Sequence, residues 1–587
     1  FTIDNLNAED LETLTLEGGS TSDSVDTVTI DRDNGTSDTT SLSTVDASGL
    51  SASLQLGTAT NGAIQLANDA SVTGGGQDDT VFWNGNSQSG VALDAGNNGS
   101  GGDSLNITGS QNIGGGIIDL SQDDQVVQFN GTTNGAVQTG FENVDASAVT
   151  DNGNAINMTG NSADNTFVGT SAGDIINGGG GSDTVDYSSA NLIPGAIMVT
   201  LDGSNQVTAT NGGADGNDTL SNVENVIGGG MVDMLTGDDN DNRLEGGAMG
   251  DTLIGGMGND TLIGGAGDDT LTGGDGDDRL VVDTADTSID AGSGVDTLVT
   301  DDTGGATVAM TDNSGNFEVI EIASDNAHNI TIANGTLDNT NAELTVVNGT
   351  DSDLTTGITI NASNLTGQSN GTDNTLNFDG SGEGFGGGDT ITGGDNDDTI
   401  DGGAGGDMIT GGAGADTLDG GAGDDTFNFD PTGSGLVSGE SIDGGEGTGD
   451  SISFATGGAA DTFDLTVATI LNVENVTVAD ADDSVDLQQG TGVTSVTGFA
   501  NGTANTDALT VEQGDTAFEG TAEGAVGDVD MAGEWFFASE GGGTDAALTF
   551  FDEVSGASQT INLVGTANAS DDDSASVSGG NIQVDIA

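Results

Sequence analysis

The chain has 587 residues, of which 97 are acidic and only three are basic, and its formal net charge is −94. This charge favours cations as partners and argues against binding to nucleic acid or to anionic membranes, since both need clustered Lys and Arg. Cysteine is absent, which excludes disulfides and thiolate metal sites, and no apolar run of about 20 residues predicts a membrane-spanning helix.

The amino-terminal part of the chain predicts strands and turns. Glycine accounts for 104 residues, and Thr, Val and Ile alternate in short stretches bounded by Gly, Asn and Asp, which is typical of strands. Residues 1–159 are therefore expected to form an irregular β-rich, solenoid-like region, with residues 45–72 as one example. Two isolated segments rich in glycine and aspartate, GGGQDDTVF (74–82) and GSGGDSL (99–105), lie within it.

Residues 160–300 contain a nine-residue period. From residue 228 the chain divides into the blocks GGGMVDMLT, GDDNDNRLE, GGAMGDTLI, GGMGNDTLI, GGAGDDTLT and GGDGDDRLV. The next block, VDTADTSID, keeps only its apolar eighth residue, Ile289, whereas AGSGVDTLV restores the pattern, and three weaker blocks begin at residue 160. The sixth positions that we single out in this region are Asp174, Asp183, Asp233, Asn242, Asp251, Asp260, Asp269, Asp278 and Asp296.

The remaining regions follow in chain order. Residues 301–383 are expected to be intervening solenoid rungs, residues 384–453 form a second array, and residues 454–510 are further β-rich rungs. The sixth positions of the second array are Asp389, Asp398, Asp407, Asp416 and Asp425. In residues 511–587, three alternating strands carry the densest aromatic residues of the chain, which are Trp535, Phe536, Phe537, Phe550 and Phe551.

A second sequence element recurs between the arrays: an apolar residue, a glutamate, and then alternating apolar residues. The alternation predicts a strand, and we interpret each copy as a rung that starts or continues a stack. The alternative is that these glutamates form a separate site. The copies are LETLTLEGG (11–19), FENVDAS (141–147), VENVIGGG (223–230), FEVIEIAS (317–324) and VENVTVAD (473–480).

The nine-residue pattern resembles the RTX family of calcium-binding nonapeptide repeats, G-G-x-G-x-D-x-U-x with U apolar. The resemblance implies an all-β fold, a parallel β-roll or β-helix solenoid with a carboxy-terminal antiparallel β cap formed by residues 511–587. In such a solenoid six residues form a turn and three form a strand, the eighth residue points inward, and two repeats close one coil of eighteen residues. The final segment, NIQVDIA, resembles the short apolar tail of type I secretion substrates.

The resemblance also implies the cofactor, Ca²⁺, bound at multiple sites. Residues eighteen apart then lie above one another at the usual strand spacing of about 4.8 Å, where stacked carboxylates repel unless a cation lies between them. Ca²⁺ takes six to eight oxygen ligands, and the family geometry supplies an Asp from each of two same-edge turns together with carbonyls of the glycine turns. Acidity of a salt-adapted surface would explain the charge but not the fixed sixth position. The predicted ligands are the sixth-position residues named above and Gly246, Gly255, Gly264, Gly273, Gly393, Gly402, Gly411 and Gly420.

The sequence contains no constellation that predicts catalysis. His328 is the only histidine, which excludes HExxH zinc chemistry, and it precedes the single G-x-S-x-G motif around Ser369, where a hydrolase needs a later histidine. Trp83 and Trp535 have two interpretations, stacking on a sugar or packing in a core or cap. We therefore expect no catalytic residues and no enzyme.

The expected function is structural. The resemblance is to bacterial RTX S-layer-like surface proteins, which implies a calcium-stabilised protein secreted by a type I system that forms a cell-surface layer, a filament or an extracellular matrix. The expected partners are calcium ions and further copies of the chain in a homo-oligomer or polymer, with cell-surface polysaccharide as an additional candidate. The alternatives are the carboxy-terminal RTX portion of a large adhesin, or that of a secreted enzyme whose catalytic domain lies outside this chain.

Overall fold

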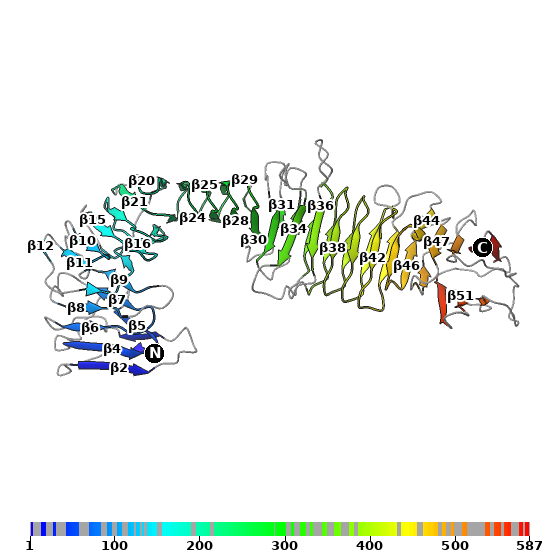
Figure 1. The fold of residues 1–587 in the computed structure, drawn as a ribbon, viewed down its shortest axis with the longest axis horizontal. Helices are drawn as coiled ribbons and strands as arrows, with labels where there is room; N and C mark the ends of the chain where they lie inside the picture. The colour runs from blue at the N-terminus through cyan, green and yellow to red at the C-terminus, as the bar shows by residue number, and fades with distance from the viewer. Residues whose placement is uncertain are drawn as a thin grey trace. The chain divides into compact units, whose positions relative to one another are not determined.

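The computed structural model forms two compact units, residues 1–294 and 295–587. Each unit is a stack of short strands that follow one another as the rungs of a solenoid (Figure 1). The structure describes residues 2–3, 13–18, 27–30, 43–57, 70–83, 91–96, 102–108, 116–122, 125–129, 132–133, 138–149, 155–189, 195–211, 216–283, 285–286, 288–300, 307–309, 317–323, 329–332, 343–348, 357–365, 375–380, 386–430, 436–454, 462–478, 484–488, 493, 495–497, 508–512, 534–539, 545–552, 557–564, 574–578 and 581–585.

The first unit contains three columns of strands, where a column is a set of strands that pair from one coil to the next. One column comprises β1 (Thr2–Ile3), β3 (Thr27–Ile30), β5 (Ser53–Leu56), β7 (Thr80–Trp83), β9 (Ser104–Ile107), β14 (Asn143–Asp145), β16 (Thr166–Val168), β18 (Thr184–Asp186), β22 (Asn225–Ile227), β24 (Arg243–Ala248), β26 (Thr261–Ala266) and β28 (Arg279–Val282). Its strands pair in parallel.

The second column of this unit is also parallel except at β11, β12 and β20, which pair antiparallel. It comprises β12 (Thr132–Thr133), β11 (Val126–Phe129), β10 (Gly116–Asp119), β15 (Ile156–Thr159), β17 (Ile175–Asn177), β21 (Asp218–Ser221), β20 (Val207–Asn211), β19 (Ile197–Thr200), β23 (Met234–Thr236), β25 (Thr252–Met257), β27 (Thr270–Asp275) and β29 (Ser288–Ser293). The third column comprises β2 (Thr13–Gly18), β4 (Thr44–Leu50), β6 (Ser71–Thr73), β8 (Ala92–Asp94) and β13 (Gln138–Thr139).

The second unit has the same organisation. One column comprises β30 (Thr297–Thr300), β32 (Val319–Ile322), β34 (Glu343–Asn348), β36 (Thr375–Asp379), β38 (Thr399–Asp401), β40 (Thr417–Asp419), β42 (Ser441–Asp443) and β45 (Thr469–Leu471). A second comprises β31 (Thr307–Ala309), β33 (Asn329–Thr331), β35 (Thr359–Asn361), β37 (Thr390–Thr392), β39 (Met408–Thr410), β41 (Thr426–Phe429), β43 (Ser451–Phe454), β46 (Asn475–Val478) and β48 (Ser495–Thr497). A third begins with β44 (Thr462–Asp464), β47 (Ser484–Gln488) and β49 (Ala508–Glu512).

The expected antiparallel cap is present and forms a minor part of the fold. Strands β50 (Glu534–Ser539), β51 (Asp545–Asp552) and β52 (Ala557–Val564) pair antiparallel, and β52 joins the solenoid by pairing in parallel with β48. Trp535 is opposite Phe550 in this pairing. The last strands, β53 (Ser574–Ser578) and β54 (Asn581–Asp585), form a hairpin whose β54 pairs antiparallel with β49.

Eighteen residues make one coil in the arrays, as the sequence predicts. Leu253 pairs with Leu235 on one column, and Leu262 pairs with Leu244 on the other. Each of these eighth-position leucines is fully buried, so it supplies the core of its half-coil. One inward apolar side chain for every nine residues is a small core compared with the backbone entropy that nine ordered residues lose.

Helix is nearly absent from the described part of the chain. Its only helical element there is the single 3₁₀ turn η1 (Leu465–Val467), at whose start the Asp464 side chain accepts a hydrogen bond from the Thr466 amide. Among the described residues, no helix is long and apolar enough to cross a membrane. Trp83 is buried in β7, which favours core packing over sugar stacking, whereas His328 and Ser369 lie outside the described residues.

Candidate functional site

The sixth-position side chains lie buried where each glycine-rich turn meets its strand. All fourteen predicted positions are at most 3% exposed, although thirteen of them are aspartates. A buried carboxylate is costly unless hydrogen bonds or an opposite charge compensate it. The partners of the two carboxylate oxygens therefore determine what the site can bind.

Oδ1 of twelve of the thirteen sixth-position aspartates accepts a hydrogen bond from a backbone amide in the coil before it. Asp251 Oδ1 accepts from the Asp233 amide at 2.7 Å, and Asp260 Oδ1 accepts from the Asn242 amide at 2.7 Å. In the second array, Asp407 Oδ1 accepts from the amide of Asp389 at 2.7 Å. We call this series the aspartate ladder. It joins residues eighteen apart on the same edge, as the sequence predicts.

The second oxygen behaves differently along each ladder. In some turns it accepts from the amide at position two of its own turn, as Asp233 Oδ2 does from Gly229 and Asp398 Oδ2 does from Gly394, both at 2.6 Å. In other turns Oδ2 is buried and has no hydrogen-bond partner. The predicted positions with such an oxygen are Asp183, Asp251, Asp260, Asp269, Asp389, Asp407, Asp416 and Asp425.

Several of these unpartnered oxygens lie close to a carbonyl group of the following turn. A Cβ on Gly402 would lie 2.6 Å from Asp407 Oδ2 and 2.8 Å from the carbonyl oxygen of Gly420, so the two oxygens converge on a space that only glycine leaves open. The same arrangement recurs around Gly246, where Asp251 Oδ2 faces the carbonyl of Gly264. Two acceptors that face each other without a donor form a favourable site for a cation.

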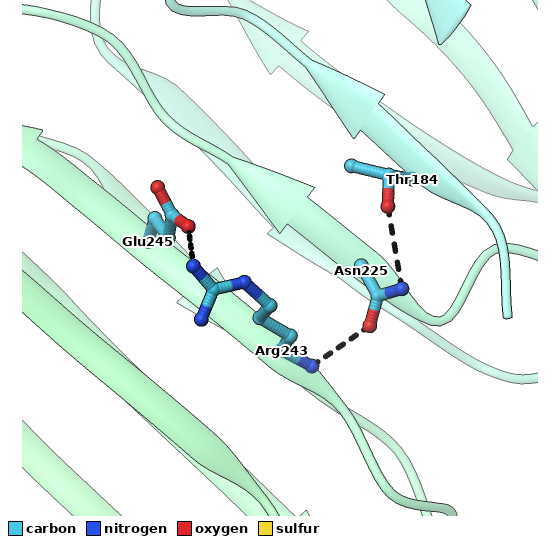
Figure 2. Close-up of polar contacts among 4 residues, drawn as sticks. All are labelled: Thr184, Asn225, Arg243 and Glu245. Atoms are coloured by element: carbon cyan, nitrogen blue, oxygen red, sulfur yellow. Dashed lines mark hydrogen bonds and ion pairs between the residues drawn. The ribbon is translucent and has the colours of Figure 1, made fainter. Parts of the chain in front are cut away.

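The electrostatics of the turns favour the same conclusion. Burial, reinforced by neighbouring carboxylates, raises the pKa of Asp251, Asp260 and Asp407 to about 7. The charged neighbours that shift these pKa values are carboxylates. Arg243 is half exposed and pairs with Glu245, as Figure 2 shows. Either a proton or a bound cation must therefore compensate these carboxylates.

The donor set fits a hard cation such as Ca²⁺. Within the described residues, no three His, Cys, Asp or Glu side chains surround a common point, so backbone carbonyls must supply part of any coordination shell. Carboxylate and carbonyl oxygens are the ligands of Ca²⁺, whereas Zn²⁺ and Cu²⁺ prefer the nitrogen and sulfur ligands that this chain almost lacks.

The four recurring glutamates that the structure describes belong to the same ladders, which favours a role as rungs over a separate site. Glu224 Oε2 accepts from the Asp183 amide at 2.8 Å, in place of the next sixth-position aspartate. Three further glutamates repeat this contact with the preceding ladder aspartate: Glu142 with Asp103, Glu318 with Asp296, and Glu474 with Asp450. Glu12 of the fifth copy lies outside the described residues.

The residue after the glutamate connects the coils on either side. Asn225 donates to Thr184 Oγ1 at 3.3 Å in the preceding coil and accepts from the Arg243 amide at 3.0 Å in the following coil (Figure 2). In that following coil Asn242 donates through Nδ2 to the Glu224 carbonyl at 2.8 Å and accepts through Oδ1 from the Asp238 amide at 2.7 Å. The asparagine at this sixth position is therefore a hydrogen-bond donor to the preceding coil, which an aspartate could not be.

Several ladder residues were missed because they break the nine-residue period. Asp286 accepts from the Asp269 amide although it lies seventeen residues later. Asp103 accepts from Asp79 at a separation of 24 residues, and Asp218 accepts from Asp174 at a separation of 44. The glycine-rich segments 74–82 and 99–105 indicate the pair of Asp79 and Asp103 in the sequence, whereas Asp218 has no comparable sequence signal.

Comparison with known families agrees with this geometry. The family model for the RTX calcium-binding nonapeptide repeat (4 copies) matches residues 159–191, 227–260, 245–280, 254–289, 383–418 and 402–430. No curated protein matches the chain. The matched segments contain the predicted sixth positions except Asp296.

Proposed function

We propose that this chain, whose multiple RTX nonapeptide repeats bind calcium ions, is a secreted structural protein. It forms a cell-surface layer, a filament or an extracellular matrix, and it leaves the cell through a type I secretion system. The observation that supports a structural role is the stack of parallel coils, whose unpartnered carboxylate oxygens recur along both units. No catalytic step is part of this proposal.

The proposed calcium sites lie between turns that are one coil apart on the same edge. In the first array the pairs are Asp233 with Asp251, Asp251 with Asp269, Asn242 with Asp260, and Asp260 with Asp278. In the second array they are Asp389 with Asp407, Asp407 with Asp425, and Asp398 with Asp416. Asp174, Asp183 and Asp296 take the same role, and the remaining ligands are carbonyls of Gly246, Gly255, Gly264, Gly273, Gly393, Gly402, Gly411 and Gly420.

The convergence of acceptors supports these assignments. Asp407 Oδ2 and the Gly420 carbonyl both point into the space beside Gly402, and no donor reaches Asp407 Oδ2. Bound Ca²⁺ supplies the positive charge that this space lacks. The chain's own residues hold the ligands in place, since Asp407 Oδ1 is fixed by the Asp389 amide.

Calcium also provides a means of assembly. Side-by-side contact between copies with a net charge of −94 is repulsive, and three arginines are too few to offset it. We therefore propose that copies of the chain contact one another through bridging Ca²⁺ or through less acidic surfaces. The antiparallel strands β52, β51 and β50 follow β48 at the end of its column, and we propose that they disfavour end-to-end strand pairing there.

Electron microscopy and light scattering across a calcium titration test this proposal. Ordered layers or filaments should appear with Ca²⁺ and dissolve in EDTA, and high NaCl in EDTA should not restore them, because monovalent ions screen but do not bridge carboxylates. Assemblies that persist in EDTA would exclude calcium bridging. A strict monomer at high protein and calcium would exclude the structural role, and monomers that bind cell-surface polysaccharide would favour an adhesin.

A further inference from the structure

One glycine-rich turn of the second array lies outside the segments that the family model matches. It stacks on the last turn that the model does match. Residues 444–450 read GGEGTGD, one residue longer than the six-residue repeat turn, and they lie beyond residue 430, where the family match ends. Its aspartate, Asp450, lies 25 residues after Asp425 instead of eighteen. The nine-residue period therefore does not reveal the turn.

The backbone places this turn directly over turn 420–425. Ala422 bridges in parallel to Glu446, the Gly423 amide donates to the Glu446 carbonyl at 2.9 Å, and the Glu446 amide donates to the Gly421 carbonyl at 2.5 Å. The strands that follow the two turns, β41 and β43, are paired in parallel with Phe427 opposite Ile452. The turn accommodates its extra residue on the exposed side, where the Thr448 amide donates to Asp424 Oδ1 at 3.3 Å.

Asp450 occupies the ladder position of a repeat aspartate. Its side chain is fully buried, and its Oδ1 accepts from the Asp425 amide at 2.8 Å. Its Oδ2 has no hydrogen-bond partner. The next coil then ends this ladder, because the Asp450 amide donates to Glu474 Oε2 at 3.1 Å.

Two pairs of acceptors lie close together between the two turns, one pair beside Gly447 and the other beside Gly420. A Cβ on Gly447 would overlap the Gly423 carbonyl oxygen and would lie 2.6 Å from Asp450 Oδ2. A Cβ on Gly420 would lie 2.5 Å from Asp425 Oδ2, itself without a hydrogen-bond partner, and 2.8 Å from the Gly444 carbonyl oxygen. The chain cannot neutralise these oxygens with a basic side chain, because residues 295–587 contain neither Lys nor Arg.

We propose that turns 420–425 and 444–450 bind one additional Ca²⁺ with Asp425, Asp450 and the carbonyl oxygens of Gly423 and Gly444 among its ligands. This site lies within the second array (384–453) and adds one coil to the part of it that the family model matches. It depends on the calcium binding of the repeats and is independent of whether the chain assembles on a cell surface.

Native mass spectrometry of the full chain at saturating Ca²⁺ tests the site. Asp450→Asn should bind one calcium ion fewer than the parent chain. In hydrogen exchange, residues 436–454 of this variant should lose their calcium-dependent protection. Residues 246–283 should keep theirs. Asp464→Asn is the matched control: it removes the same charge at an exposed position in the same unit and should leave both measurements unchanged.

An unchanged ion count in a folded Asp450→Asn chain would overturn the proposal. If this variant does not fold, anomalous diffraction from calcium in crystals of the unaltered chain tests the site instead. A peak between Gly423 and Asp450 supports the site, and its absence while peaks occupy the repeat turns refutes it. Absence of peaks from the repeat turns as well would instead contradict calcium binding by the arrays.

Discussion

At the scale of single residues, each ladder aspartate uses its two oxygens for different purposes. Oδ1 accepts an amide from the coil before it, whereas Oδ2 faces carbonyl oxygens in the turn region, as Asp407 illustrates. The first oxygen stabilises the stack without metal, and the second, where no amide reaches it, requires a cation or a proton. A single aspartate is therefore both a hydrogen-bond acceptor of the fold and a proposed calcium ligand.

Replacement of Asp260 by alanine should weaken calcium binding on one edge only. Two of the proposed sites, those shared with Asn242 and Asp278, lose a ligand, while Asp251 and Asp269 on the other edge keep theirs. The Asn242 amide also loses its acceptor, which we expect to cost about 1–3 kcal/mol. Calcium titration followed by native ion counting measures both effects. The exposed control Asp239→Ala should leave the ion count unchanged, and loss of ions from the Asp251 edge would contradict the register.

Glu224 offers a test of the glutamates that end the ladders. In Glu224→Ala the Asp183 amide loses its acceptor, so the free energy of unfolding in saturating calcium should fall by about 1–3 kcal/mol. Glu224→Gln keeps an acceptor oxygen and should be much milder. Urea unfolding provides the measurement. Glu245→Ala removes a partly exposed ion pair and should change the free energy by less than about 1 kcal/mol; an equal effect of both alanine variants would refute the ladder role.

At the scale of the structural element, the glycine turn has two conformations. Some turns have glycine with positive φ at position two, such as Gly247 at φ 109°, whereas in others the position-two amide donates to the aspartate of the same turn, as Gly229 does to Asp233. In the turns of Asp251 and Asp407 the positive-φ conformation coincides with an unpartnered Oδ2. Turn geometry therefore distinguishes turns whose aspartate has a free acceptor oxygen from turns whose own amide satisfies it.

Gly247→Ala should disrupt the turn that contains Asp251. The alanine Cβ would overlap the Gly229 carbonyl oxygen, and φ 109° is a conformation that side chains with a Cβ rarely adopt. The calcium concentration at half-folding should rise severalfold, as measured by circular dichroism. Gly230→Ala is the matched control, because its Cβ would meet nothing within 4 Å and should leave the midpoint unchanged. Equal midpoints for the two variants would show that the backbone at Gly247 tolerates a side chain.

At the scale of the whole molecule, a small core is combined with a very large negative charge. One apolar eighth-position residue per nine residues is buried in the arrays, and the chain carries a net charge of −94. Repulsion among the carboxylates therefore opposes folding in the absence of calcium. Such a chain can remain unfolded where calcium is scarce and fold where calcium is abundant.

This balance predicts that calcium and acid both promote folding. In EDTA at neutral or higher pH the arrays should lose β structure, and millimolar Ca²⁺ should restore it. Burial raises the folded-state pKa of Asp251, Asp398 and Asp407 to about 7, well above the 3.8 of an exposed aspartate. The folded state then binds more protons, so its stability without calcium is greatest at low pH and is lost as pH rises through about 7.

Circular dichroism in EDTA between pH 5 and pH 8 measures this effect. The β content should be higher at pH 5 than at pH 8, and added Ca²⁺ should remove most of the difference. Equal β content with EDTA and with calcium at pH 8 would contradict the calcium-dependent fold. Greater β content at pH 8 than at pH 5 in EDTA would contradict the raised pKa values.

The sequence alone determined the fold class, the eighteen-residue coil and the sixth-position aspartates, because each nine-residue repeat encodes its own turn, strand and inward apolar residue. Only the tertiary structure revealed that Glu224, Asp286 and Asp450 continue or end the same ladders. Their coils have other lengths, so no sequence period relates them. A hydrogen bond between coils depends on position in space, and the intervening residues can vary in number without disturbing it.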